Sequence, residues 1–189
     1  MVVVAQLVRA LDCGSRGRRF ETGLPPKIKG LFFRPFFVLK LSFYDKHHTF
    51  TMAGEDQVYQ RGNDDGIIIF KGWKICLRIC YDLRFPVWSR NTQDYDLLIY
   101  VANWPKPRIS AWDTLLKARA IENMSYVVGV NRCGEDSKGN DYPGHSAIYD
   151  SLGNCISGDL SSETKNISTF INYQELQAHR RKLRFLEDR

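Results

Sequence analysis

The sequence predicts an α/β fold in which a sheet is covered by helices. Apolar runs of strand length alternate with a helical pattern in the middle of the chain, and shorter runs separated by turn residues lie toward both ends. This alternation is typical of a mixed sheet packed against helices, not of an all-β or all-α domain. At 189 residues, 43% hydrophobic and 25% charged, the chain has the size and composition of one globular domain. No apolar run reaches the length that spans a bilayer.

Strands are predicted where short runs rich in β-branched and aromatic residues end at turn residues. These runs are 37–43, Ile67–Phe70, 73–80, 96–102, 126–130, 146–149, 154–158 and 167–171. Polar turns or loops are expected between them, the longest being 52–62 and 131–144.

The clearest helical pattern covers Ile109–Asn123, with Ser110 as the expected N-cap. Its expected apolar face consists of Leu115, Leu116, Ala118, Ala120 and Ile121. A short helix is expected at 87–91 and an amphipathic basic helix at 173–185.

The net charge of +6 is confined to the first forty residues. Residues 1–40 hold eight Lys or Arg against two Asp or Glu, whereas residues 41–189 hold 19 of each sign. A basic arm could bind polyanions, but the neutral remainder offers it no matching face. We therefore expect no nucleic-acid partner and no membrane partner, and keep a nucleic-acid-binding protein as a minor alternative.

The same forty residues differ in character from the rest of the chain. A Gly/Arg-rich stretch at 13–19 and the Pro25-Pro26 pair interrupt any regular element. Residues 4–23 resemble the peptide obtained when a transfer-RNA gene is translated as protein. We expect 1–40 to be a foreign or disordered basic segment, and 41–189 to be the folded domain.

The five cysteines, at positions 13, 76, 80, 133 and 155, show no pairing pattern and no C-x-x-C spacing. An odd number of scattered cysteines indicates reduced thiols, so the expected location is the cytoplasm and no metal site is predicted.

One of these thiols stands where a buried strand is predicted to end. Residues 75–79 are mostly apolar, Cys80 follows, and polar side chains come directly after it. Pro86 prevents a central strand from continuing further. A thiol at the mouth of a strand beside charged groups is suited to nucleophilic attack. The alternative is a small buried core residue, because free cysteines are among the most buried residues.

Five short motifs occur in the same order as in the nitrilase, or carbon–nitrogen hydrolase, superfamily. They are Tyr44-Asp45-Lys46, Gly54-Glu55 with Gly62, Ile79-Cys80-Tyr81-Asp82-Leu83-Arg84-Phe85-Pro86, Asn103-Trp104-Pro105 and Ala118-Arg119-Ala120-Ile121-Glu122-Asn123. The chain most resembles the ω-amidase subgroup, which hydrolyses the terminal amide of 2-oxoglutaramate or 2-oxosuccinamate. The resemblance runs from about Phe43 to the end. It implies a partial α-β-β-α sandwich, paired across a two-fold axis as a homodimer.

The resemblance also implies site residues, carried over motif by motif. They are Cys80 as nucleophile, Lys46 for oxyanion stabilisation, Glu55 to orient Lys46, and Tyr81, Arg84 and Trp104 toward substrate. An amide is a poor electrophile, so a thiolate needs such an oxyanion partner. The planar guanidinium of Arg84 suits a dicarboxylate monoamide. The reaction implied needs no metal or organic cofactor.

The pattern departs from the family at its general base. The family's first Glu precedes the Lys in a region without a counterpart here, and none of Asp12, Glu21 and Asp45 has a matching context. We therefore expect an N-terminally truncated chain without turnover. The alternative is a non-catalytic fragment or pseudoenzyme that pairs with a complete relative.

Each candidate also has a purely structural interpretation. Lys46 and Glu55 could be solvated surface charges, and Trp104 could simply pack. Arg119 and Glu122, three residues apart on the predicted helix, are expected to form a structural pair. His47 and His48 are expected to be loop residues, since adjacent side chains point to different faces.

Overall fold

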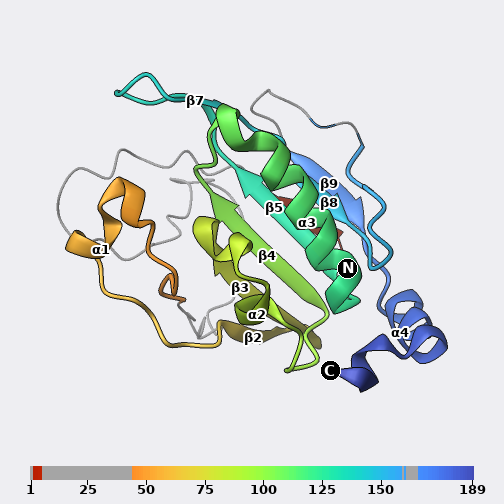
Figure 1. Cartoon of the computed structure of the whole chain (residues 1–189). Helices are drawn as coiled ribbons and strands as arrows, with labels where there is room; N and C mark the ends of the chain where they lie inside the picture. Colours follow the sequence, from red (N-terminus) through yellow and green to blue (C-terminus); the bar gives the residue numbers. More distant parts are fainter. Residues whose placement is uncertain (1, 6–43, 159, 161–165) are drawn as a thin grey trace, which may run out of the picture.

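The computed structural model describes residues 2–5, 44–158, 160 and 166–189; the strand predicted at 37–43 lies outside them. A five-stranded sheet in the order β2-β3-β4-β5-β8 organises the molecule (Figure 1). Its strands are β2 (Ile67–Phe70), β3 (Trp73–Ile79), β4 (Leu97–Ala102), β5 (Tyr126–Asn131) and β8 (Ala147–Tyr149). The three central strands are parallel, and the end strands β2 and β8 are antiparallel to their neighbours. The predicted α/β class is confirmed.

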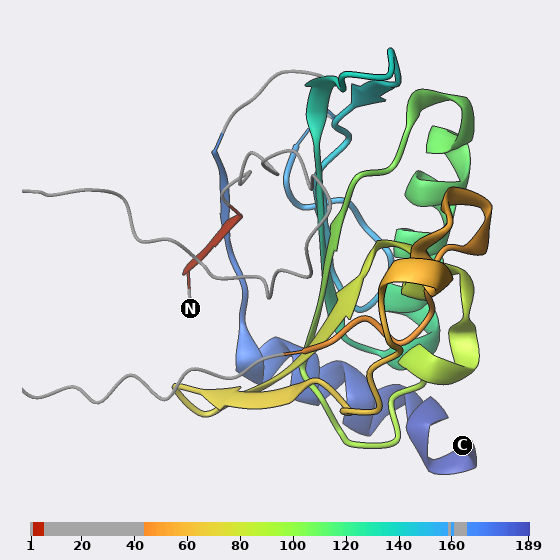
Figure 2. The same cartoon turned by 90° about the vertical axis from the view of Figure 1, so that its left-hand side faces the viewer.

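Helices cover one face of this sheet, and a two-stranded pair lies on the other (Figure 2). The covering helices are η1 (Thr51–Ala53), α1 (Glu55–Val58), η2 (Cys80–Arg84), α2 (Pro86–Ser89), η3 (Lys106–Arg108) and α3 (Ile109–Asn123). The pair consists of β1 (Val2–Ala5) and β9 (Ile167–Phe170), with Val2 opposite Phe170. The chain ends in α4 (Tyr173–Leu183) and η4 (Phe185–Asp188).

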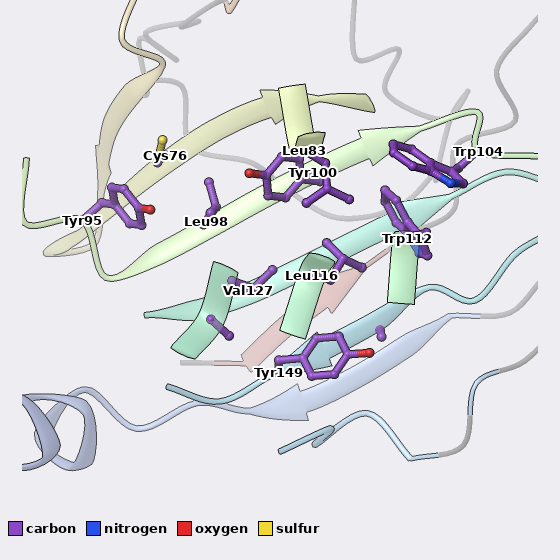
Figure 3. Close-up of a cluster of buried hydrophobic side chains, with 12 residues drawn as sticks. Cys76, Leu83, Tyr95, Leu98, Tyr100, Trp104, Trp112, Leu116, Val127 and Tyr149 are labelled. Carbon is purple, nitrogen blue, oxygen red and sulfur yellow. The ribbon is translucent and has the colours of Figure 1, made fainter. Parts of the chain in front are cut away.

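The main core lies between α3 and the sheet (Figure 3). Trp112, Leu116 and Ala120 of α3 are fully buried against alternate residues of the central strands. Gly129 of β5 allows this close approach, because a Cβ there would lie 2.3 Å from a methyl carbon of Leu116. Period-two alternation sends the other set of strand residues to a second buried cluster on the β9 and α4 side. That cluster contains Trp73, Ile75, Leu97, Tyr126, Val128, Ile148, Ile167, Ile171 and Leu176.

The bounds of α3 match the prediction, but two of its predicted details were wrong. The N-cap is Arg108, not Ser110, because η3 leads directly into the helix and no side chain caps it. Ile121 is 45% exposed, and Arg119 is buried instead. The Arg119 guanidinium can be buried because it donates to Leu83 O at 2.7 Å and to Glu122 Oε1 at 3.0 Å, which is the expected structural pair.

Two segments predicted as loops contain short regular elements. Residues 52–62 include the end of η1 and all of α1. Residues 131–144 include a hairpin of β6 (Cys133–Glu135) and β7 (Asp141–Pro143). The Asp136 carboxylate closes this hairpin by accepting the amides of Lys138 and Asn140, a side-chain interaction that periodicity does not reveal.

The strand predicted at 154–158 was wrong. Only an isolated bridge between Tyr149 and Cys155 forms there, because the Ser157 hydroxyl takes the Ile148 amide that a strand ladder would use. Several predicted bounds also shift, and α2 covers Pro86–Ser89 instead of 87–91. β3 stops at Ile79, one residue before Cys80, and α4 stops at Leu183, where Arg184 adopts a left-handed conformation (φ 57°).

Candidate active site

The carboxyl ends of the three parallel strands meet at one edge of the sheet. Cys80 follows β3, Asn103 and Trp104 follow β4, and Asn131 ends β5. The buried Asn131 amide joins two of these ends: it accepts the Trp104 amide at 2.7 Å and donates to Trp104 O at 3.0 Å. In open α/β sheets this is the edge at which ligands bind.

Cys80 adopts a left-handed backbone conformation (φ 47°) at the junction of β3 and η2. This conformation is uncommon for a residue with a side chain and often marks a functional site. The turn continues into α2, where Pro86 occupies the first helical position that suits proline. The Cys80 side chain is partly exposed and packs against the edge of the main core.

Lys46 and Glu55 form an ion pair with a separation of 2.5 Å between Nζ and Oε2. Their side chains are only 15% and 29% exposed. Glu55 Oε2 also accepts the Phe50 amide at 2.7 Å, so the carboxylate is fixed from two sides. Gly62 lies against this segment, because its amide donates to Lys46 O at 3.0 Å and a Cβ would lie 2.2 Å from Asp45 O.

The surroundings of the Cys80 thiol have opposing effects on its pKa. Burial, the largest effect, raises the pKa above the usual value for cysteine. The Lys46 ammonium and a hydrogen bond with the Asn103 backbone lower it, whereas the Glu55 charge raises it. The Lys46–Glu55 pair therefore lies near enough to Cys80 for both charges to influence its thiol.

The three residues expected near substrate differ in accessibility. Arg84 is exposed, and its guanidinium carbon lies 5.0 Å from the centre of the Trp104 ring. Trp104 is only 3% exposed, and its indole donates to Arg108 O at 2.8 Å. The Tyr81 ring packs between Phe50 and Phe85, with centroid distances of 4.8 and 5.1 Å.

Sequence reasoning missed a set of contacts beneath the site. The Asp82 side chain is completely buried and binds Tyr44 and His48, on either side of Lys46. His47 and His48 lie in a loop, as expected, and they stack on Trp88 and Phe85 with ring-centroid distances of 3.6 and 3.7 Å. Asp82 stands inside the Cys80 motif, yet nothing in the local pattern shows that its carboxylate is buried.

No helix in 44–158 or 166–189 is long and apolar enough to cross a bilayer. The same residues contain no group of three His, Cys, Asp or Glu that could hold a metal ion.

Comparisons with known proteins agree with this geometry. The family model for carbon–nitrogen hydrolases matches residues 30–181. The chain is 47% identical to the ω-amidase YafV of Yersinia enterocolitica over 145 residues, covering 77% of this chain and 57% of that one. It is 42% identical to the ω-amidase YafV of Escherichia coli K12 over 188 residues, covering 100% of this chain and 72% of that one.

A similar solved structure is XC1258 from Xanthomonas campestris, described as a CN-hydrolase superfamily protein with an arsenic adduct in the active site. It superposes with a TM-score of 0.75 at 39% identity, covering 78% of this chain and 58% of that one. The chain therefore spans less than two thirds of the length of this structure and of the Yersinia relative.

Proposed function

Because the chain belongs to the carbon–nitrogen hydrolase family, we propose that it carries an ω-amidase-like site with Cys80 as its nucleophile. The substrate class would be the terminal amide of a small 2-oxo dicarboxylate monoamide, hydrolysed to acid and ammonia. One observation carries the proposal: Cys80 stands in a left-handed conformation directly after β3, beside the partly buried Lys46–Glu55 ion pair, whose ammonium lowers the pKa of the thiol.

In the proposed reaction a carboxylate takes the proton of the Cys80 thiol, and the resulting thiolate attacks the amide carbon and forms a C–S bond. Lys46 and the Tyr81 amide would stabilise the negative oxygen of the tetrahedral intermediate. The C–N bond then breaks, and a carboxylic acid protonates the departing nitrogen to give ammonia. Water hydrolyses the resulting thioester and restores the thiol. No metal or organic cofactor takes part.

Arg84 is the proposed clamp for the substrate carboxylate. Its guanidinium is exposed and rests over the Trp104 ring, which restricts its orientation. Trp104, being largely enclosed, would contribute at the substrate site through the ring face that carries Arg84. In this proposal Trp104 orients Arg84, and the guanidinium N–H groups of Arg84 bind the substrate carboxylate in a bidentate contact.

We propose no residue of this chain as the general base. The described carboxylates that act on the Cys80 thiol include Glu55 and Asp82. Glu55 is paired with Lys46, and Asp82 is buried and fully engaged in hydrogen bonds. We therefore propose that this chain does not turn over amides on its own. We also propose that it is a cytoplasmic protein.

An activated ester at alkaline pH tests the nucleophile without requiring the base, because solvent hydroxide ionises the thiol and p-nitrophenolate leaves without a proton. Mono-p-nitrophenyl glutarate should acylate Cys80 and release about one equivalent of p-nitrophenol per chain in a rapid burst. Cys80→Ala should abolish the burst. Arg84→Gln should slow acylation by the glutarate ester about tenfold, equivalent to one charge-assisted hydrogen bond, and leave the p-nitrophenyl acetate rate unchanged. A burst that persists in Cys80→Ala would disprove the assignment.

The engaged state of both carboxylates also favours a second candidate, a non-catalytic partner of a complete relative. Mixing this chain with an intact ω-amidase and measuring mass in solution tests it. Formation of a mixed dimer supports the second candidate, whereas rapid ammonia release from 2-oxoglutaramate by this chain alone excludes it and shows that a base is present.

A further inference from the structure

The Asp82 carboxylate links the segment that contains Lys46 (residues 44–48) to the segment that contains Cys80 (residues 79–84) by hydrogen bonds. Its side chain is 0% exposed. Oδ1 accepts the His48 amide at 2.9 Å and the His48 ring nitrogen Nδ1 at 3.0 Å. Oδ2 accepts the Tyr44 hydroxyl at 2.8 Å and the Ile79 amide at 3.0 Å.

These four donors occupy informative positions along the chain. Tyr44 and His48 lie two residues before and two residues after Lys46, and Ile79 directly precedes Cys80. The described hydrogen bonds between residues 44–48 and 79–84 all end on Asp82. The Lys46 amine itself is bonded to Glu55, which fixes Lys46 within its own segment but not relative to the sulfur.

We propose that Asp82 is a positioning residue that sets the distance between the Lys46 amine and the Cys80 sulfur. The inference rests on the proposed function for the roles of these two groups, but the coupling between them is a physical property that exists without turnover. The His48 ring stacks on the Phe85 ring, and this contact also holds residues 44–48 against residues 79–85. Hydrogen bonds to a buried carboxylate fix its register, because they are directional and have no water to replace them.

Asp82→Asn tests this role with almost no change in shape. Each carboxylate oxygen accepts one backbone amide, from His48 or from Ile79. The Asn amino group must therefore face one backbone donor in either orientation. Tyr44 can rotate its hydroxyl and His48 can change tautomer, but a backbone amide cannot become an acceptor. One of the two segments must consequently move away from residue 82.

The measured quantity is the rate at which iodoacetamide alkylates Cys80 at a pH below the thiol pKa. The ratio of this rate with Lys46 to the rate with Lys46→Met is called the Lys46 factor. Tryptic peptide 79–84 contains Cys80 without any other cysteine, so mass spectrometry isolates its rate. Peptide 139–165, with the exposed Cys155, is the internal reference. Each unit of thiol pKa changes the thiolate fraction about tenfold. Lys46→Met should slow Cys80 alkylation about tenfold in the otherwise unchanged chain.

In the Asp82→Asn background the same Lys46→Met change should alter the Cys80 rate less than about threefold, well below the tenfold change expected in the otherwise unchanged chain. A factor that stays near ten would overturn the proposal. If Asp82→Asn does not fold, Tyr44→Phe combined with His48→Phe removes two of the four bonds and keeps both rings. This pair should reduce the Lys46 factor to an intermediate value, and an unchanged factor would again overturn the proposal.

Tyr100→Phe is the matched control for the loss of a buried hydroxyl group. Its hydroxyl bonds to Ser89 Oγ at 2.6 Å, not to Asp82. The Lys46 factor should remain near ten in this variant. Failure of the ester burst would refute the proposed function alone, because the alkylation measurement requires no substrate.

Discussion

Cys80 and Lys46 reach the same edge of the sheet from regions that are stabilised in different ways. The strand side, defined as β3, β4, β5 and α3, is held by a buried apolar core. The loop side, residues 44–66, includes η1 and α1, neither of which buries a single residue. Tyr44 is a large side chain of the loop side that is buried, and hydrogen bonds to Asp82 and Trp88 hold its hydroxyl group. We infer that Cys80 is placed by packing, whereas Lys46 is placed by hydrogen bonds.

The largest expected effect is on the strand side. Leu116→Ala removes a fully buried side chain that packs against Gly129 of β5. The resulting cavity should lower the free energy of unfolding by about 2–5 kcal/mol, measured by urea denaturation. Leu152→Ala, at a position 46% exposed, should stay within about 0.5 kcal/mol. Equal effects of the two changes would show that α3 does not support the sheet as described.

A matched pair of glycine variants contrasts the two sides directly. Gly62→Ala places a Cβ 2.2 Å from Asp45 O, and Gly129→Ala places one 2.3 Å from Leu116 Cδ1. Each should destabilise by about 1–3 kcal/mol through overpacking. Gly62→Ala should also weaken the effect of Lys46 on Cys80 alkylation, whereas Gly129→Ala should leave that effect intact. The comparison fails if both variants change the Lys46 effect to the same extent.

The smallest expected effect depends on pH and belongs to the loop side. The pKa of His48 lies below its usual value of 6.5, chiefly because burial disfavours the charged ring. The unfolded chain then binds this proton more readily than the folded one, so the contribution to stability is complete above pH 6.5 and is lost as the pH falls below it. His48→Phe should flatten this part of the stability profile, measured by denaturation between pH 7.5 and 5. An unchanged slope would exclude His48 as its source.

Sequence patterns predicted the strand side far better than the loop side. The central strands were located within a residue or two and the helix at 109–123 was located to the residue, because burial imposes periodicities of two and 3.6. Among the missed elements, α1, β6 and β7 are four residues or fewer in length and leave no period to detect. Side-chain hydrogen bonds hold these parts.

The candidate site shows the same division. Cys80 was identified where an apolar run stops, and its motif led to Lys46 and Glu55, which the structure brings into contact. Their chemical roles stay predictions. The network around Asp82 was not predicted, because it joins residues 38 apart in the sequence, and no local pattern encodes such a pairing.

β2 has a consequence for handling the protein. It is an end strand of the five-stranded sheet, and among the described strands only β3 pairs with it. Its Ile69 and Phe70 side chains are 75% and 53% exposed. A free apolar strand edge is a template for intermolecular β-pairing and aggregation. Solutions of this chain are therefore expected to become turbid with increasing concentration, and a lysine in place of Ile69 should delay that onset.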